Sequence, residues 1–233
     1  MMIVIKENIL DVQKNIEEAC HRVNRDPSEV TLIAVSKTKP LSDIEEAIDA
    51  GMTEFGENKV QELVDKIEHV SRPVHWHLIG HLQTNKVKYI VDKDLLIHSV
   101  DSVKLANEIQ KDALKKQAHC NILLEVNVAQ EASKFGFTVE EVPAAVEEIS
   151  KLSNVHIQGL MTIAPFVENP EDNRVIFAKL HKLLLDIKSR NIDNVNMSVL
   201  SMGMTNDYTV AVEEGATMVR VGTGIFGARN YNI

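Results

Sequence analysis

The sequence has 233 residues, a length that suits one large domain and that α/β barrels often fill as a single unit. Its hydrophobic share is 44% and its net charge is −9, which argues against a nucleic-acid-binding surface because such a surface needs clustered lysine and arginine. No apolar run approaches the roughly 20 residues of a membrane span, and the apolar start at 1–5 is too short for the core of a signal segment, so none is expected. Cys20 and Cys120 lie far apart and lack metal-like spacing, so we expect two free thiols in a cytoplasmic protein.

An amphipathic helix is expected first, because Ile5, Ile9, Val12 and Ile16 form one apolar stripe. Eight short, mostly apolar segments then alternate with amphipathic stretches, the pattern of a parallel sheet whose strands are covered on both faces. The predicted strands are 31–37, 54–58, 74–80, 95–101, 121–127, 157–163, 195–202 and 218–226. The predicted helices between them are 42–50, 59–70, 101–117, 138–152, 173–189 and 206–214.

Eight strand–helix units predict a closed (β/α)8 barrel of the TIM type that forms a single domain over residues 1–233. An open, doubly wound sheet is the alternative. Ser42 is expected to cap the helix that follows it, and Thr138 is expected to form a capping box with Glu141. Only 227–233 follow the last strand, so we expect the N-terminal helix to cover the barrel where an eighth helix would otherwise lie.

The residues that could carry chemistry follow the predicted strands, which is where parallel barrels place their active sites. Lys37 ends the first strand and shares the parity of Ile33 and Val35, so its stem is expected to point into the barrel. Burial there would lower the pKa of its amine and leave the amine able to attack an aldehyde. The alternative is a solvated lysine at a strand end. Lys39 is the rival amine, but Pro40 is expected to hold it extended in the loop.

The last two strands are expected to form an anion site. Gly203, Gly222 and Gly224 let backbone N–H groups approach a ligand, and Ser201 and Thr223 offer hydroxyl donors. The loops after strands seven and eight are where barrels commonly bind phosphate. Each glycine alone is also an ordinary turn residue, so the prediction depends on the combination.

Arg220 lies inside the last apolar strand, where an unpaired guanidinium is costly. One interpretation is a buried ion pair with a carboxylate on a neighbouring strand, such as Glu125. The other is contact with a pyridine nitrogen, which a permanent cation would keep unprotonated and therefore a poor electron sink. An amine, a guanidinium and an anion site at the strand ends together predict a site for pyridoxal 5′-phosphate. His75 and His77 would share one face of a strand, but no set of metal ligands is completed nearby and no metal site is expected.

Six segments closely resemble motifs of one family, the YggS-type pyridoxal phosphate homeostasis proteins, and they follow the same order along essentially the whole chain. They are AVSKTK at 34–39, FGEN at 55–58, WHLIG at 76–80, GLMT at 159–162, SMGM at 201–204 and VRVGT at 219–223. That family is similar to the barrel domain of alanine racemase. The resemblance implies a Schiff base between Lys37 and the cofactor, with Arg220 facing the pyridine nitrogen. It also implies phosphate contacts from Ser201, Gly222 and Thr223, and it places Asn58 near the ring.

The resemblance implies binding and delivery of the cofactor, with no established catalytic reaction. Racemisation needs a base on each face of the cofactor, and only Lys37 is evident in the sequence. Tyr208 is the tyrosine expected nearest the pocket, but it is not in a second domain of the kind that supplies the racemases' opposing tyrosine. We therefore expect a monomeric or weakly dimeric carrier without catalytic residues, with apo-enzymes as recipients. The alternatives are a small amino-acid racemase and a barrel enzyme for another phosphorylated metabolite.

Overall fold

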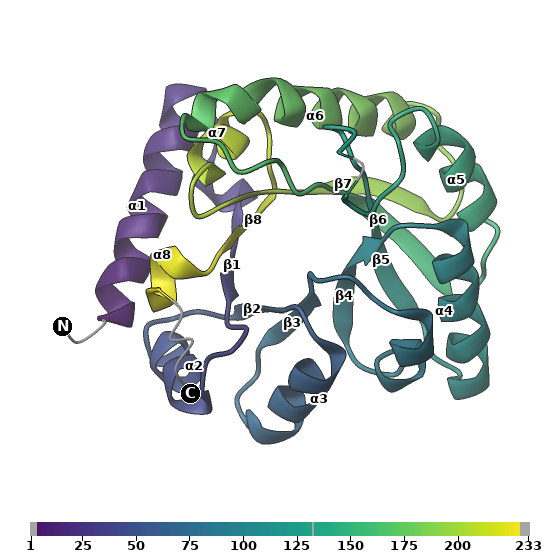
Figure 1. Ribbon diagram of the computed structural model, residues 1–233, viewed down its shortest axis with the longest axis horizontal. Coiled ribbons are helices and arrows are strands. Elements are labelled where there is room, and N and C mark those ends of the chain that lie inside the picture. Colours follow the sequence, from purple (N-terminus) through teal and green to yellow (C-terminus); the bar gives the residue numbers. More distant parts are fainter. Residues whose placement is uncertain (1–3, 132, 229–233) are drawn as a thin grey trace.

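The computed structural model describes residues 4–131 and 133–228, and its eight parallel strands close into a barrel in the order β1 to β8 (Figure 1). The strands are β1 (Thr31–Val35), β2 (Glu54–Glu57), β3 (His75–Leu78), β4 (Leu95–Val100), β5 (Cys120–Glu125), β6 (Val155–Met161), β7 (Val195–Met204) and β8 (Met218–Val221). The barrel closes where β1 pairs with β8, with Ile33 opposite Arg220. The predicted barrel is confirmed, and the open-sheet alternative is wrong.

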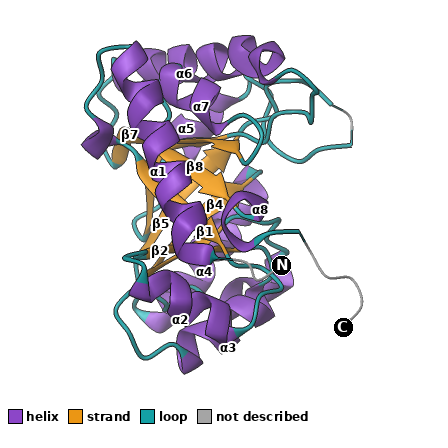
Figure 2. Cartoon of the chain, turned by 90° about the vertical axis from the view of Figure 1, so that its left-hand side faces the viewer, coloured by secondary structure: helices purple, strands orange, loops and turns teal. Residues whose placement is uncertain are grey.

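Helices surround the barrel (Figures 1 and 2). They are α2 (Leu41–Asp49), α3 (Val60–His69), α4 (Val103–Lys116), α5 (Val142–Ile149), α6 (Arg174–Lys188), α7 (Tyr208–Glu213) and the short α8 (Thr223–Phe226). Short 3-10 helices also lie in the connections: η1 (Pro27–Glu29), η2 (Thr84–Tyr89) and η3 (Pro170–Asn173).

One of the two capping predictions is confirmed and the other is wrong. Thr138 and Glu141 form the reciprocal capping box, with the Thr138 N–H 2.8 Å from the Glu141 carboxylate and the Glu141 N–H 3.3 Å from the Thr138 hydroxyl. Helix α2 instead begins at Leu41, with Pro40 as its N-cap at φ −69° and Ser42 inside the first turn. Proline has no side-chain oxygen that could accept a hydrogen bond, so α2 begins without a side-chain cap.

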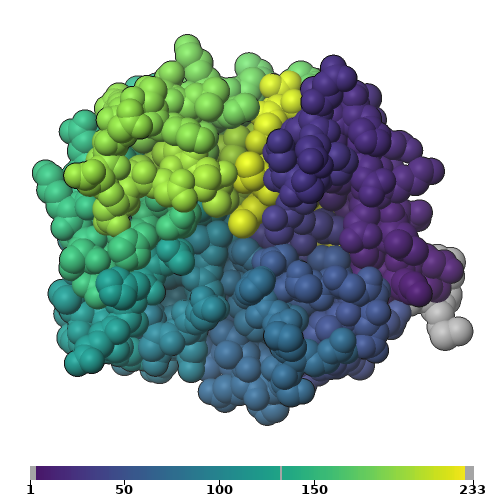
Figure 3. Space-filling view, turned by 180° about the vertical axis from the view of Figure 1, so that it is seen from behind, coloured from purple at the N-terminus to yellow at the C-terminus, as the bar shows by residue number. Residues whose placement is uncertain are grey.

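Helix α1 (Ile5–Arg22) lies outside the barrel and packs against α2, α7 and α8. In Figure 3 the purple N-terminal segment lies beside the yellow C-terminal segment. Its stripe of Ile5, Ile9, Val12 and Ile16 is buried, which contributes about 1.5–3 kcal/mol per side chain. The prediction that this helix covers the barrel next to the last strand is confirmed.

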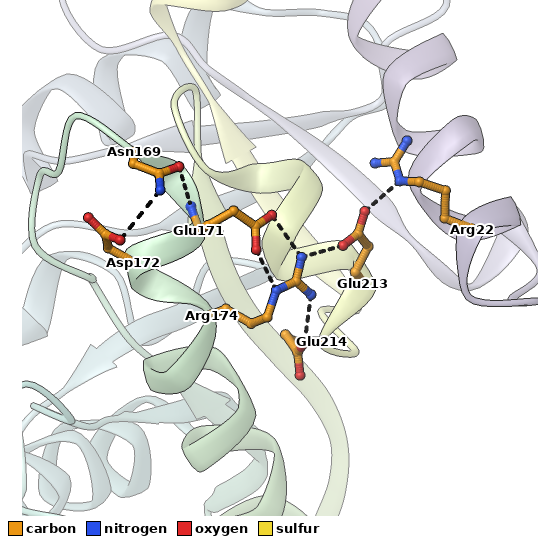
Figure 4. A network of polar contacts seen from close by, with 7 residues as sticks. All are labelled: Arg22, Asn169, Glu171, Asp172, Arg174, Glu213 and Glu214. Atoms are coloured by element: carbon orange, nitrogen blue, oxygen red, sulfur yellow. Dashed lines mark hydrogen bonds and ion pairs between the residues drawn. The ribbon is translucent and has the colours of Figure 1, made fainter.

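An ion-pair network ties α1 to the neighbouring helices (Figure 4). Arg22 of α1 donates to the Glu213 carboxylate of α7 at 2.6 Å. Arg174, at the start of α6, donates to Glu213 at 2.6 Å, to Glu214 at 2.7 Å and to Glu171 at 2.7 Å. Because these side chains are partly exposed, each pair alone contributes little to stability, and the shared carboxylate mainly fixes where α1 lies relative to α6 and α7.

Cys20 and Cys120 are free thiols, as the spacing predicts, and both are buried. Across the described ranges, no helix has both the length and the apolar character needed to cross a bilayer.

Candidate functional site

A cavity of about 580 Å³ lies at the C-terminal ends of the strands. Three cationic side chains line it, those of Lys37, Lys39 and Arg220, and no carboxylate does so within the described part of the chain. Its other lining residues are Val35, Asn58, Ile79, Ile163, Phe166, Met204, Thr205, Asn206, Gly222, Thr223 and Gly227. In a protein whose net charge is −9, this concentration of positive charge defines an anion site with apolar walls.

Lys37 lies in a tight turn directly after β1. The Ser36 N–H donates to the Gly56 carbonyl at 3.1 Å, and the Lys39 N–H closes the turn on the Ser36 carbonyl at 3.0 Å. Thr38 has a φ of 63°, a left-handed conformation that strains a β-branched residue. Such strain persists only where the surrounding structure holds the backbone in place.

Three side chains hold this backbone in place: Glu57 at the end of β2, and Glu62 and Lys66 of α3. We call them the Lys66 clamp. The Lys66 amine donates to the Ser36 carbonyl at 2.8 Å, to Glu57 at 2.8 Å and to Glu62 at 2.7 Å. The Ser36 hydroxyl donates to Glu57 at 2.6 Å, and the Thr38 N–H donates to Glu62 at 2.6 Å. The residues on both sides of the site lysine are therefore fixed by one polar cluster.

The clamp is buried, and this shifts its electrostatics. Glu57 is 0% exposed and Lys66 is 4% exposed. Burial raises the pKa of the Glu57 carboxyl, while Lys66 and the Ser36 hydroxyl act to lower it. Sequence reasoning missed this cluster. The available signal was Glu62 and Lys66 at i, i+4 spacing, with Lys66 three residues after the buried Leu63 and thus on the apolar face of the helix.

The prediction that Lys39 extends into the loop is wrong. Its amine donates to the Phe226 carbonyl at 2.8 Å, and its side chain lines the same cavity as Lys37. Pro40 restricts only the backbone of Lys39, so the long side chain is still able to turn back. It meets the carbonyl end of α8, where a cation is favoured.

Arg220 is 4% exposed and is held by two neutral acceptors. One nitrogen, Nη1, donates to the Ser201 hydroxyl at 2.5 Å, and the other, Nη2, donates to the Thr162 carbonyl at 2.8 Å. Burial lowers the pKa of Arg220 to about 10, although the charges of Asp207 and Glu125 act to raise it. Arg220 therefore remains a cation at neutral pH.

The interpretation that Arg220 forms an ion pair with Glu125 is wrong, since among the described side chains no carboxylate lies within 4.0 Å of its guanidinium nitrogens. Burial raises the pKa of Glu125 to about 7, and the charge of Asp101 adds to this effect while Arg220 opposes it. A carboxyl group that is partly protonated at neutral pH is a poor partner for a guanidinium.

The ends of β7 and β8 meet at one side of the cavity. The Thr205 hydroxyl accepts from the Gly224 N–H at 3.4 Å and from the Thr223 hydroxyl at 3.2 Å. Gly222 and Thr223 stand at the start of α8, and the first N–H groups of a helix have no acceptor within the helix. Thr205 and Asn206 also line the cavity. Sequence reasoning placed the start of a helix near Asn206 but named neither Thr205 nor Asn206 as a binding residue.

Ser201 and Gly203 are not among the described residues that line the cavity. Ser201 is 0% exposed, and its hydroxyl contacts Arg220 and His98. Gly203 has a φ of 92°, and a Cβ there would lie 2.5 Å from the Ala211 Cβ, so glycine is required for β7 to approach α7. Direct contact of Ser201 and Gly203 with a cofactor stays a prediction.

Asn58 lines the cavity at the end of β2. A Cβ at Gly80 would lie 2.4 Å from the Asn58 carbonyl oxygen, so the ends of β2 and β3 approach this closely only because residue 80 is glycine. Gly80 thereby places Asn58 beside the cavity.

The candidate metal-site histidines and Tyr208, which the sequence also suggested, make their contacts away from this cavity. His75 and His77 both contact Glu54, at 2.6 and 2.8 Å, and within 4–131 and 133–228 no group of three potential metal ligands is found. The Tyr208 hydroxyl accepts from the Asn15 side chain of α1 at 3.0 Å, so it faces the covering helix and not the cavity.

The chain's closed parallel barrel agrees with its family match: the model of the family described as "Alanine racemase, N-terminal domain" matches residues 8–230. An alanine racemase structure from Clostridium difficile is similar with a TM-score of 0.75 at 13% identity, covering 98% of this chain and 58% of that chain. At this identity the likeness shows the fold alone.

Within this class, the chain belongs to the pyridoxal phosphate homeostasis protein family. The relative of that name from Aquifex aeolicus is 45% identical over 226 residues, covering 97% of this chain and 98% of the relative. The one from Pseudomonas aeruginosa is 42% identical over 231 residues, covering 99% and 98%. The structure of PipY from Synechococcus elongatus with PLP bound has a TM-score of 0.79 at 35% identity, covering 91% of this chain and 100% of that chain. The family prediction made from the motifs is confirmed.

Proposed function

We propose that this protein binds pyridoxal 5′-phosphate in the cavity at the strand ends and serves the homeostasis of this cofactor as a carrier. The observation that carries the proposal is the cavity lining. Among the described residues it includes Lys37, Lys39 and Arg220 and no carboxylate, although the whole chain has a net charge of −9. A multiply charged phosphate that also bears an aldehyde matches this lining. Relatives that carry the homeostasis name, and the PLP-bound PipY structure, support the assignment.

The residues present fit each part of the cofactor. Lys37 would bind the aldehyde carbon covalently, and Arg220 would meet the pyridine nitrogen. Gly222 and Thr223 would receive the phosphate, and Asn58 would lie beside the ring. When bound, the cofactor supplies an electron-withdrawing ring conjugated to its aldehyde carbon.

Ser201 and Gly203 support this binding from behind. Ser201 holds the Arg220 guanidinium through the 2.5 Å hydrogen bond, and Gly203 lets the end of β7 pack on α7. The Lys66 clamp fixes the turn that carries Lys37. Cofactor binding should therefore also depend on residues that do not themselves contact the cofactor.

The electrostatics favour carriage over racemisation. Arg220 remains cationic, so it would leave a ring nitrogen unprotonated and give little stabilisation to negative charge on a bound amino acid. Tyr208 contacts Asn15 on α1 and supplies no second base at the cavity.

We further infer that apo-enzymes receive the cofactor from this protein, and that the protein is a monomer or weak dimer. A cytoplasmic location accords with Cys20 and Cys120, which are both buried free thiols. The loaded protein and an apo-enzyme can be incubated in one solution and, separately, on opposite sides of a dialysis membrane. Comparing the two shows whether transfer of the cofactor requires contact between the proteins.

A spectroscopic titration tests the proposed function. Pyridoxal 5′-phosphate should produce a visible absorbance band that saturates at one equivalent per chain, and pyridoxal, which lacks the phosphate, should bind far more weakly. The loaded protein in deuterated water should leave the α-protons of L- and D-alanine in place. Equal affinity for both aldehydes would contradict the anion site, and rapid α-proton exchange with inversion would replace the carrier by a racemase.

A further inference from the structure

The interior of the barrel below the cavity contains a continuous series of polar side chains that we call the interior chain. Arg220 Nη1 lies 2.5 Å from Ser201 Oγ, and Ser201 Oγ lies 2.9 Å from His98 Nδ1. His98 Nε2 lies 2.9 Å from His77 Nδ1, and His77 Nε2 lies 2.8 Å from Glu54 Oε2. Glu54 is the first residue of β2, so the chain runs from the cavity to the opposite end of the barrel.

The interior chain is closed to solvent over most of its length. His98 and Ser201 are 0% exposed, and His77 is 3% exposed. A buried polar group that lacks a hydrogen bond costs about 1–3 kcal/mol, so each link has to be satisfied by its neighbour. The arrangement of the protons is therefore set by the two ends.

Arg220 and Glu54, at the two ends of the interior chain, impose the same donor-to-acceptor direction on its hydrogen bonds. A guanidinium only donates hydrogen bonds, and an ionised carboxylate only accepts them. Burial acts to raise the pKa of Glu54, but hydrogen bonds from His77 and His75 bring it below its ordinary value, so Glu54 is ionised at neutral pH. A singly protonated His77 must therefore donate from Nε2 to Glu54 and accept at Nδ1.

The same reasoning fixes the other two links. Burial lowers the pKa of His98 well below its ordinary value, and the positive charge of Arg220 acts in the same direction, as would any charge on His77, so His98 is neutral. Its one N–H has to lie on Nε2 to satisfy His77, which leaves Nδ1 as an acceptor. The Ser201 hydroxyl then donates to His98 while its oxygen accepts from Arg220.

We propose that Glu54, His77, His98 and Ser201 are positioning residues that hold the Arg220 guanidinium at the cavity through hydrogen bonds that all point toward Glu54. The inference rests on the proposed function only for the identity of the ligand that Arg220 meets. The interior chain itself belongs to the protein without ligand.

The direction of the chain has a consequence for anion binding. Ser201 has a single hydroxyl hydrogen, and that hydrogen is used on His98. The Ser201 side chain thus cannot donate to a phosphate while the chain is intact, and Ser201 acts through Arg220. Arg220 has five N–H donors, of which two serve Ser201 and Thr162 among the described contacts.

The first test reads the tautomers directly in the ligand-free protein. Nitrogen-15 NMR of labelled histidine side chains distinguishes a protonated imidazole nitrogen from an unprotonated one, and His77→Gln and His98→Gln variants assign the signals. We expect both His77 and His98 to carry their proton on Nε2. A proton on Nδ1 of His98 would reverse the chain and overturn the proposal.

The second test measures the effect on the cofactor with a matched pair of variants. His98→Leu removes both hydrogen bonds, whereas His98→Gln keeps one donor and one acceptor. We expect the leucine variant to lose about tenfold or more in affinity for pyridoxal 5′-phosphate, on the order of one hydrogen bond to a charged group, and the glutamine variant to recover most of it. Urea denaturation of both variants shows whether they fold.

The two tests separate this inference from the proposed function. If the wild-type protein fails to bind the cofactor, the proposed function fails while the tautomers still decide the interior chain. If His98→Leu binds as tightly as wild type, His98 does not position Arg220. Should His98→Leu not fold, Glu54→Leu removes the acceptor at the far end, and unchanged affinity and tautomers in that variant would equally overturn the proposal.

Discussion

Replacing Lys66 by methionine should destabilise the protein strongly, and in a pH-dependent way. The substitution removes three hydrogen bonds of 2.7–2.8 Å and leaves Glu57, which is 0% exposed, with only the Ser36 hydroxyl. Removing one partner of a buried ion pair costs about 3–5 kcal/mol. Because whole domains are stable by about 5–15 kcal/mol, a loss of this size is readily measured.

The loss should be largest at alkaline pH. Burial already raises the pKa of Glu57, and Lys66 is the main influence that lowers it, so the variant should raise this pKa further. A carboxyl whose pKa is higher in the folded than in the unfolded protein is protonated in both states at low pH and imposes no penalty there. The penalty appears as the pH rises above the pKa of the carboxyl in the unfolded protein, about 4.3. It is complete once the pH exceeds the pKa in the folded protein. Lys66→Met should therefore lose less stability at pH 5 than at pH 8.

Urea denaturation followed by the fluorescence of Trp76, the single tryptophan, measures these free energies of unfolding. The matched control is Glu57→Gln combined with Lys66→Met, which removes both charges and should recover part of the loss. If Lys66→Met loses the same free energy at both pH values, or if the double variant loses the sum of the two single variants, the reasoning about the buried pair is refuted. Cofactor affinity should stay reduced in the double variant, because the Ser36 carbonyl still lacks its lysine.

Three further substitutions test the cavity. Thr223→Val should lower affinity for pyridoxal 5′-phosphate by on the order of tenfold to a hundredfold, the equivalent of about 1.5–3 kcal/mol for a hydrogen bond to a charged group, and should leave pyridoxal binding nearly unchanged in the same titration. Gly80→Ala should destabilise folding by about 1–3 kcal/mol in urea and displace Asn58, since its Cβ would lie 2.4 Å from that carbonyl; wild-type stability would contradict the close approach. Arg220→Glu should weaken cofactor retention or shift its absorbance band, and an unaltered spectrum at equal affinity would exclude contact with the ring.

The parts of the fold that depend on local pattern were predictable from the sequence. Short, mostly apolar segments mark all eight strands, and the stripe that begins at Ile5 marks α1, because burial selects apolar residues on the buried part of each element. That Lys37 and Arg220 lie at the cavity was also predictable, since a lysine at a strand end and a charge inside an apolar strand are visible in the chain. The start of α2 was not, because the cap at Pro40 depends on how the chain leaves the Lys37 turn.

The residues that support the site were hidden because their partners are distant in sequence. His98 and Ser201 lie 103 positions apart and meet only when the barrel closes. Lys39 was misplaced because the Phe226 carbonyl that it contacts lies 187 positions away. Neither contact leaves a local periodicity or spacing, so pattern reasoning alone does not reveal it.

The most direct test of the account is to locate the covalent attachment. Wild-type protein loaded with pyridoxal 5′-phosphate is reduced with borohydride, digested and mapped by mass spectrometry, with Lys37→Ala and Lys39→Ala treated in parallel. We predict that the cofactor mass is found on Lys37 in the wild type and in Lys39→Ala, and that it is absent from this site in a folded Lys37→Ala. A label on Lys39 in the wild-type protein, or full labelling of Lys37→Ala, would contradict the account.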